Sequence, residues 1–116
     1  MIEITKKIVE RAMLVALDTK AYSKEVVEEN LAEIEELANT AGAETVFKII
    51  QSKARMDSAY YIGKGKAEEL AQLVELNDIN IIIFDDDLTP VQVRNLSDLF
   101  KIKVIDRSGL ILDIFA

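Results

Sequence analysis

The sequence of 116 residues contains no cysteine, no histidine and no tryptophan, and it has only one proline and four glycines. Without cysteine, disulfide bonds and thiolate metal sites are excluded. Without histidine, a serine–histidine–aspartate triad, a haem ligand and most zinc sites are excluded as well. Half of the residues are hydrophobic, so the composition is that of a folded chain rather than a disordered one.

Long hydrophobic runs are missing too, because every apolar run is far shorter than the roughly 20 residues of a membrane-spanning helix. The first apolar stretch lies between Glu3 and Glu10 and is followed by no small-residue cleavage site, so it does not resemble a signal peptide. We therefore expect a soluble, cytoplasmic protein with no membrane partner. The length predicts a single domain over residues 1–116.

Acidic residues outnumber basic ones, by 21 to 14, and the charges are distributed unevenly. The formal net charge is −7, which argues against general coating of nucleic acid. Residues 23–40 carry six glutamates against one lysine, which is typical of a solvated helix face. Residues 48–66 reverse this sign, with one acid, Asp57, among the basic residues Lys48, Lys53, Arg55, Lys64 and Lys66. We expect one basic surface on an acidic molecule.

The hydrophobic pattern alternates between the strand and helix periods. It predicts strands over 11–17, 44–53, 81–85 and 103–106, although a helix over 11–17 is not excluded by the pattern alone. It predicts helices over 23–41, 66–76 and from residue 89, with a last amphipathic segment that begins at Ser108 or Gly109. Ser23 is expected to cap the first helix, and Thr89, Pro90 and Gln92 form a capping-box pattern. The apolar pattern is still unbroken at Ala116, so we expect a piece of a longer protein.

Strands that alternate with helices predict an α/β fold, a mainly parallel four-stranded sheet flanked by helices. The buried run at 81–85 fits the centre of this sheet. In open sheets of this kind, ligands sit at the carboxyl ends of the strands. The loops that follow the four strands are therefore the first places to look for function.

The loop over 54–65 has three interpretations. A nucleotide P-loop is the weakest, because Gly65-Lys66 is followed by Ala67 where Ser or Thr is needed. An ordinary turn into a helix is the second. The third is a contact with RNA, in which basic side chains lie next to tyrosines that can stack on bases. The candidate RNA-binding residues are Lys53, Arg55, Tyr60, Tyr61, Gly63, Lys64, Gly65 and Lys66.

The acidic run Asp85, Asp86 and Asp87 ends the predicted central strand. Such carboxylates can bind Mg²⁺, but they also favour the start of the next helix, whose dipole attracts negative charge. We favour the second interpretation. Asp106 and Arg107 stand at the end of the last predicted strand. They could form a local salt bridge or fix the last helix against the sheet, and we favour the second role.

Four motifs in order resemble one known family. TAGAE at 40–44, YIGKGKAEEL at 61–70, IIIFDDDLTPVQVRNL at 81–96 and VIDRSGLILDIFA at 104–116 resemble the N-terminal domain of the HflX family of translational GTPases. The resemblance covers residues 12–116. In that family a helical hairpin and a GTP-binding domain follow this domain, and the members associate with the large ribosomal subunit in splitting or rescuing stalled ribosomes.

The resemblance implies a regulatory role rather than catalysis for this stretch. GTP and Mg²⁺ would be bound by the later domain, so we expect no GTP binding or hydrolysis by residues 1–116. The implied partners are the large ribosomal subunit, through its rRNA near the peptidyl transferase centre, and the protein's own GTPase domain. The residues implied to face RNA are Tyr61, Gly63, Lys64, Gly65 and Lys66.

Two alternatives stay open at this stage. One is a Mg²⁺-dependent ATP site built from Lys64, Lys66, Asp85 and Asp86. The other is a purely structural domain that packs on the GTPase domain.

Overall fold

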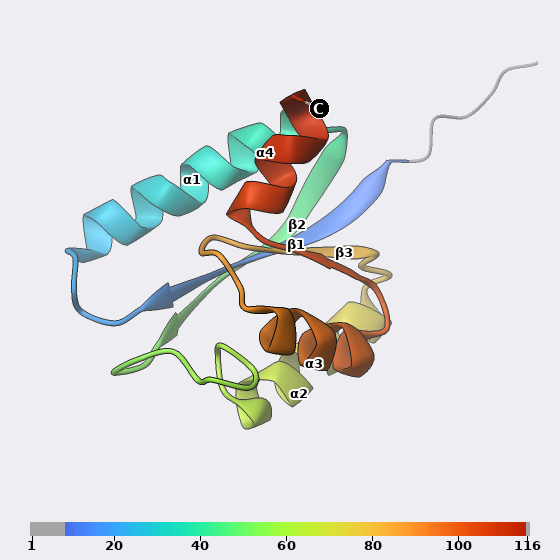
Figure 1. The fold of residues 1–116 in the computed structure, drawn as a ribbon. Helices are drawn as coiled ribbons and strands as arrows, with labels where there is room; N and C mark the ends of the chain where they lie inside the picture. Colours follow the sequence, from blue (N-terminus) through green and yellow to red (C-terminus); the bar gives the residue numbers. More distant parts are fainter. Residues whose placement is uncertain (1–8, 116) are drawn as a thin grey trace, which may run out of the picture.

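The computed structural model describes residues 9–115, which form a parallel sheet between two pairs of helices (Figure 1). The predicted α/β class and the alternation of strands with helices are confirmed. The elements in chain order are β1 (Glu10–Asp18), α1 (Lys24–Thr40), β2 (Ala43–Ser52), α2 (Lys64–Leu76), β3 (Ile81–Phe84), α3 (Pro90–Phe100), β4 (Lys103–Ile105) and α4 (Arg107–Phe115).

The four strands lie in the order β2-β1-β3-β4, and all three neighbouring pairs are parallel. From β1 the chain moves outward to β2, whereas from β3 it moves outward in the other direction to β4. The carboxyl ends of β1 and β3 therefore form the point at which the strand order reverses. In open sheets this point is the usual ligand crevice.

Alternation of side chains along β1 and β3 produces two hydrophobic cores, because successive strand residues point to opposite faces of a sheet. Met13 of β1 and Phe84 of β3 face α2 and α3, whereas Leu14 and Ile83 face α1 and α4. All four side chains are fully buried. The sheet is thus covered on both faces, as the continuous apolar run of β3 predicts.

Two of the predicted helix starts are confirmed in atomic detail. The backbone N–H of Val26 donates to the Ser23 hydroxyl at 3.3 Å. In α3 the Gln92 N–H donates to Thr89 Oγ1 at 3.2 Å, and Gln92 Oε1 accepts from the Thr89 N–H at 2.9 Å. Such caps satisfy N–H groups that have no partner within the helix.

Two other helices begin earlier than the sequence predicts. Helix α2 starts at Lys64 rather than at residue 66, after Gly63 with φ +89°, so Lys64, Gly65 and Lys66 belong to its first turn and not to a loop. Helix α4 starts at Arg107, because Asp106 Oδ1 accepts a hydrogen bond from the Gly109 N–H at 2.8 Å and caps it. In both cases the first turn contains a glycine. Because glycine has a low helix propensity, the sequence alone places the helix start too late.

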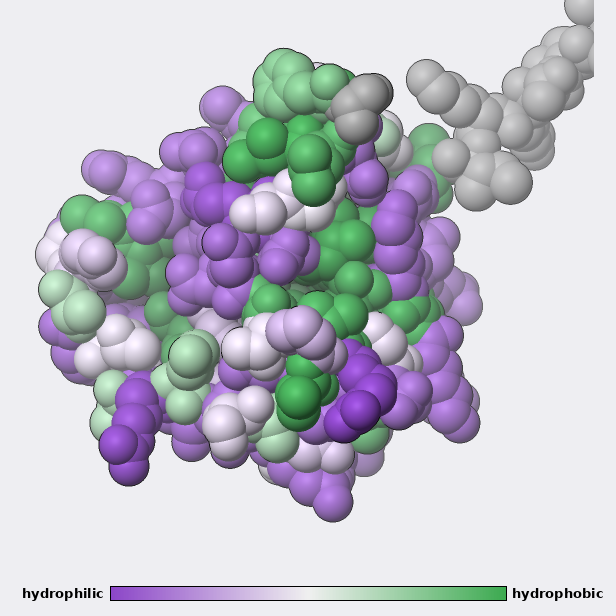
Figure 2. Space-filling model, viewed as in Figure 1, coloured by the Kyte–Doolittle hydropathy of each residue, from purple (hydrophilic) through white to green (hydrophobic). Residues whose placement is uncertain are grey.

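One face of α4 is apolar and exposed. Ile111, Leu112 and Phe115 are 38%, 64% and 77% exposed, and Figure 2 shows hydrophobic surface at the top of the molecule, where α4 lies in Figure 1. Leu110 on the opposite side is buried against the sheet. Within residues 9–115, no helix has the length and apolar character needed to cross a membrane.

Candidate functional site

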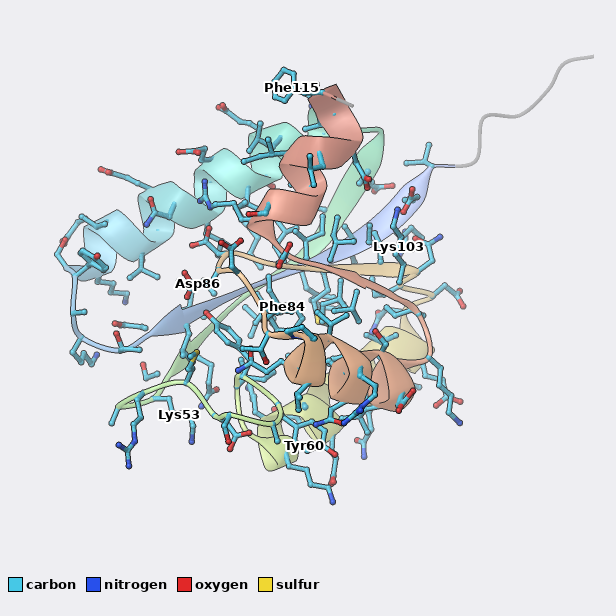
Figure 3. The ribbon with its side chains drawn as sticks, in the orientation of Figure 1. Lys53, Tyr60, Phe84, Asp86, Lys103 and Phe115 are labelled. Carbon is cyan, nitrogen blue, oxygen red and sulfur yellow. The ribbon has the colours of Figure 1, made fainter. Side chains whose placement is uncertain are left out.

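The carboxyl edge of the sheet brings together the loops that follow all four strands. Figure 3 shows Lys53, after β2, and Asp86, after β3, on the same side of the molecule, whereas Lys103 at the start of β4 lies on the other side. An open hollow of about 590 Å³ lies over residues 53–58 at this edge. The other edge has a hollow of about 560 Å³ lined by Glu35, Glu36 and Glu44, which would repel a polyanion.

Residues 53–62, called the basic loop below, fold back on themselves. The backbones of Asp57 and Tyr61 exchange two hydrogen bonds of 2.8 and 3.0 Å as an antiparallel bridge. The Asp57 carboxylate accepts the N–H groups of Ala59 and Tyr60 at 2.9 and 2.6 Å. Tyr61 adopts φ +63°, in the left-handed region that side chains other than glycine seldom occupy. The loop is therefore a built turn and not a flexible connection.

Helix α3 holds this turn from outside. Gln92 is fully buried, and its Nε2 donates to the Asp57 carbonyl at 2.7 Å. Asn95 Nδ2 donates to the Ala59 carbonyl at 3.1 Å. The buried amide of Gln92 would be costly if it were not satisfied, so α3 fixes one conformation of the loop.

Tyr61 faces the core rather than solvent, which corrects the expectation that its ring faces RNA. The side chain is 1% exposed, and its ring packs edge-on against Phe84 with centroids 5.6 Å apart. Its hydroxyl donates a hydrogen bond to Asp86. Burial, and then the bond to Asp86, raise the pKa of Tyr61 well above its ordinary value. Tyr61 thus joins the basic loop to the segment after β3.

The predicted basic residues gather around the loop and the start of α2. Arg55 and Lys64 are exposed, Lys53 and Tyr60 are half-buried, and Lys66 forms an ion pair of 3.3 Å with Glu69. The Lys53 ammonium lies 3.7 Å from the position that a Cβ on Gly63 would take. Lys53, Arg55 and Lys64 form no ion pair with any residue between 9 and 115. Their charges are free to attract an anion.

The acidic segment after β3 is bonded to side chains of other elements, which corrects the expectation that its carboxylates serve the start of the next helix: Thr89 caps α3, and the first turn of α3 contains no acid. Arg107 Nη2 lies 2.5 Å from Asp85 Oδ1, and Arg107 Nη1 lies 2.7 Å from Glu33 Oε1 on α1. Burial by itself lowers the pKa of Arg107, but the bonds to Asp85 and Glu33 raise it overall. Burial raises the pKa of Asp85, against the opposing effect of Arg107. Arg107 therefore fixes α4 against the sheet through Asp85, and not through Asp106.

This arrangement gives the Mg²⁺–ATP hypothesis no added support. Asp85 is bonded to Arg107, Asp86 to Tyr61, and Lys66 to Glu69. No group of three or more potential metal-binding side chains occurs among residues 9–115.

Asp18 at the end of β1 is a residue that the sequence analysis missed. Its carboxylate is buried and accepts the Lys20 N–H at 3.0 Å, and its main-chain carbonyl accepts the Lys53 N–H at 3.0 Å. The backbone bond from Lys20 lowers the pKa of Asp18. The signal available in the sequence was an acid that ends a buried apolar strand. Asp18 thus anchors both the β1–α1 loop and the basic loop through its hydrogen bonds.

The fold and the loop arrangement define an open α/β domain with a preorganised, partly basic carboxyl edge. A family model described as GTP-binding GTPase N-terminal matches residues 28–116. Proteins named GTPase HflX from Caldanaerobacter subterraneus, Lacrimispora saccharolytica and Escherichia coli are 48%, 45% and 44% identical over 92%, 96% and 76% of this chain. The chain therefore belongs to the family of N-terminal domains of HflX-type GTPases.

The chain spans only about a quarter of the length of these relatives, at 24%, 26% and 21%. Two crystal structures of SsGBP mutation variants share the fold, with TM-scores of 0.69 and 0.70 at 24% identity. They match 92% and 93% of this chain, which covers 32% of each of them. The predicted family and fold are both confirmed.

Proposed function

We propose that this chain is the ribosome-binding and regulatory domain of an HflX-like GTPase and that it docks on large-subunit rRNA near the peptidyl transferase centre. The contact is made by the basic loop and the first turn of α2. The observation that supports this most strongly is the clamped basic loop beside the first turn of α2, which together present Lys53, Arg55 and Lys64 without ion-pair partners among residues 9–115.

Three physical effects favour a phosphate backbone at this place. Lysine and arginine side chains without protein partners raise the affinity for RNA, because their contact with phosphates releases counterions from the nucleic acid. A loop already held by Gln92, Asn95 and Tyr61 loses little conformational entropy on binding. The N-cap of α2 is Gly63, which has no side chain to satisfy the first N–H groups of the helix, so these groups can receive a phosphate oxygen.

Sedimentation with purified ribosomal subunits tests this proposal. The 116-residue chain is centrifuged with large or small subunits at low and at physiological salt. We expect it to pellet with large subunits, less so at higher salt, and not with small subunits. A chain that stays in the supernatant under all of these conditions would contradict docking by this domain.

A second proposed contact lies on α4 and is with the protein's own GTPase domain. Ile111, Leu112 and Phe115 leave an apolar face exposed at the end of the domain, and the relatives are about four times as long as this chain. In a longer protein, replacing Leu112 and Phe115 with Ser should alter GTP hydrolysis while subunit binding persists. An unchanged rate of GTP hydrolysis would contradict a contact between α4 and the GTPase domain.

A further inference from the structure

We propose that Tyr22 is the base-stacking platform of this surface and that it receives an unpaired base of single-stranded RNA. The sugar–phosphate backbone then lies along Lys20, Lys24 and the basic loop. This inference rests on the proposed function, because it names the kind of RNA that the same carboxyl edge takes. No feature of the family match points to Tyr22, which lies before the matched residues 28–116.

Tyr22 is the tyrosine with a free ring. The chain has three tyrosines. Tyr61 is 1% exposed and its hydroxyl is bonded to Asp86, and Tyr60 is half-buried. Tyr22 is 70% exposed, and its ring stacks on no other aromatic ring in the described part of the chain. An exposed aromatic face is what RNA-binding surfaces use to hold a splayed-out base.

Asp18 fixes the start of the loop that carries Tyr22. The Asp18 carboxylate holds the Lys20 N–H and the Asp18 carbonyl holds the Lys53 N–H, each at 3.0 Å. Lys20 has φ +70°, which turns the chain just before Tyr22. The loop that carries Tyr22 therefore leaves the sheet beside the basic loop, and both are anchored at a single buried residue.

The charges on the two halves of the carboxyl edge differ in sign. In the loops after β1 and β2 and at the starts of α1 and α2, Lys20 is paired with Asp18 and Lys66 with Glu69. The remaining charges are Lys24, Lys53, Arg55 and Lys64, against Glu25 and Asp57. The loops after β3 and β4 and the start of α4 supply Asp85, Asp86, Asp87 and Asp106, against Arg107 alone. A polyanion is therefore attracted to the half that contains Tyr22. An aromatic ring among cations favours single strands, because the bases of a duplex have no free face to offer.

The test measures binding of the 116-residue chain to a fluorescent, unstructured RNA of about 12 nucleotides and to a duplex of the same length. Tyr22→Ala should weaken single-strand binding roughly 5- to 100-fold, as loss of one base–aromatic stack does. Its salt dependence should not change, since the ring carries no charge. Tyr22→Phe keeps the ring and should bind within about twofold of the original chain. Duplex binding should be the same for all three proteins.

A tryptophan at this position gives a direct signal, because the chain contains no other tryptophan. The fluorescence of the Tyr22→Trp variant should be quenched by single-stranded RNA and not by the duplex.

Unweakened single-strand binding by Tyr22→Ala would overturn the inference and leave the proposed docking intact. Equal weakening for single strand and duplex would also overturn it. If the original chain bound neither RNA at low salt but pelleted with large subunits, RNA stacking would be excluded while docking stood. If it failed in both assays, the proposed function would fail as well.

Discussion

The Lys53 N–H donates a 3.0 Å hydrogen bond to the carbonyl of Asp18 and thereby joins two loops of the carboxyl edge. The two residues follow paired strands, because Asp18 of β1 lies opposite Ser52 of β2. A slip in the register of these strands would move Lys53 away from the loop that contains Lys20 and Tyr22. The geometry of the proposed RNA surface thus depends on the sheet itself.

Replacing Asp18 with Asn should destabilise the domain in a pH-dependent manner. The folded state lowers the pKa of Asp18, so its ionised form contributes stability above the unfolded value of about 3.9. That contribution is lost as the pH falls through the lowered folded pKa. The melting temperature of Asp18→Asn should lie below that of the original chain at pH 7, and the gap should close in acid. A gap that is constant from pH 7 to pH 2.5 would exclude this role.

Ile82 tests the central place of β3. Its side chain is fully buried between β1 and β4, on the face that α2 and α3 cover. Ile82→Ala should cost about 2–5 kcal/mol of unfolding free energy. Denaturant unfolding measures this, with exposed Val91 on α3 replaced by Ala as a control that should cost far less. A loss below roughly 1 kcal/mol for Ile82→Ala would not fit a core position.

Tyr61 should make stability sensitive to alkaline pH. Its folded pKa is raised by burial and by the bond to Asp86, so its contribution is complete below the unfolded pKa of about 10 and is lost as the pH rises above it. Tyr61→Phe should cost about 0.5–1.5 kcal/mol at pH 7, because one hydrogen bond is removed. The difference in unfolding free energy between the two proteins should shrink between pH 9 and pH 11. A difference that does not vary with pH would mean that the hydroxyl is neither buried nor bonded to Asp86 in solution.

Arg107 should be important for stability because it joins three elements. Its guanidinium contacts Asp85 after β3 and Glu33 on α1, and it begins α4. Arg107→Ala should cost roughly 1–3 kcal/mol, less than the 3–5 of a fully buried pair because the side chain is partly exposed. A double-mutant cycle with Asp85→Asn measures the coupling. If the costs of the two single substitutions added up to the cost of the double substitution, the pair would contribute nothing. The matched control is Arg94→Ala, at an exposed residue of α3.

Much of the fold could be predicted because it follows from local patterns. The apolar spacing of residues 27–38 and the caps at Ser23 and Thr89 need only neighbouring residues, and each was found as predicted. The start of α2 could not be predicted in the same way. Gly63 and Gly65 favour a loop by propensity, whereas the helix is set by the positive φ of Gly63 and by the buried Ala67 and Leu70.

The candidate site depended more on tertiary structure. Two adjacent tyrosines in a polar loop look equivalent in the sequence, but the left-handed backbone at Tyr61 turns its ring into the core and leaves Tyr60 half-buried. The pairing of Arg107 with Asp85 was missed because these residues are far apart in the chain. They meet only because β3 and β4 are neighbours in the sheet.

The most direct test of the account is the salt dependence of binding to large ribosomal subunits when two of the cations without ion-pair partners are removed. The variant Arg55→Ala, Lys64→Ala removes two exposed side chains that form no ion pair among the described residues. Each phosphate contact contributes roughly 0.7 to 0.9 to the slope of log affinity against log salt. The matched control is Glu29→Gln, Glu36→Gln on the exposed face of α1.

We expect the lysine–arginine variant to bind large subunits more weakly and with a slope flatter by roughly one to two, while its melting temperature stays unchanged. The glutamine variant should keep the slope of the original chain. Unaltered affinity and slope in the lysine–arginine variant would contradict the account, because the basic loop would then be a structural turn and the docking surface would lie elsewhere.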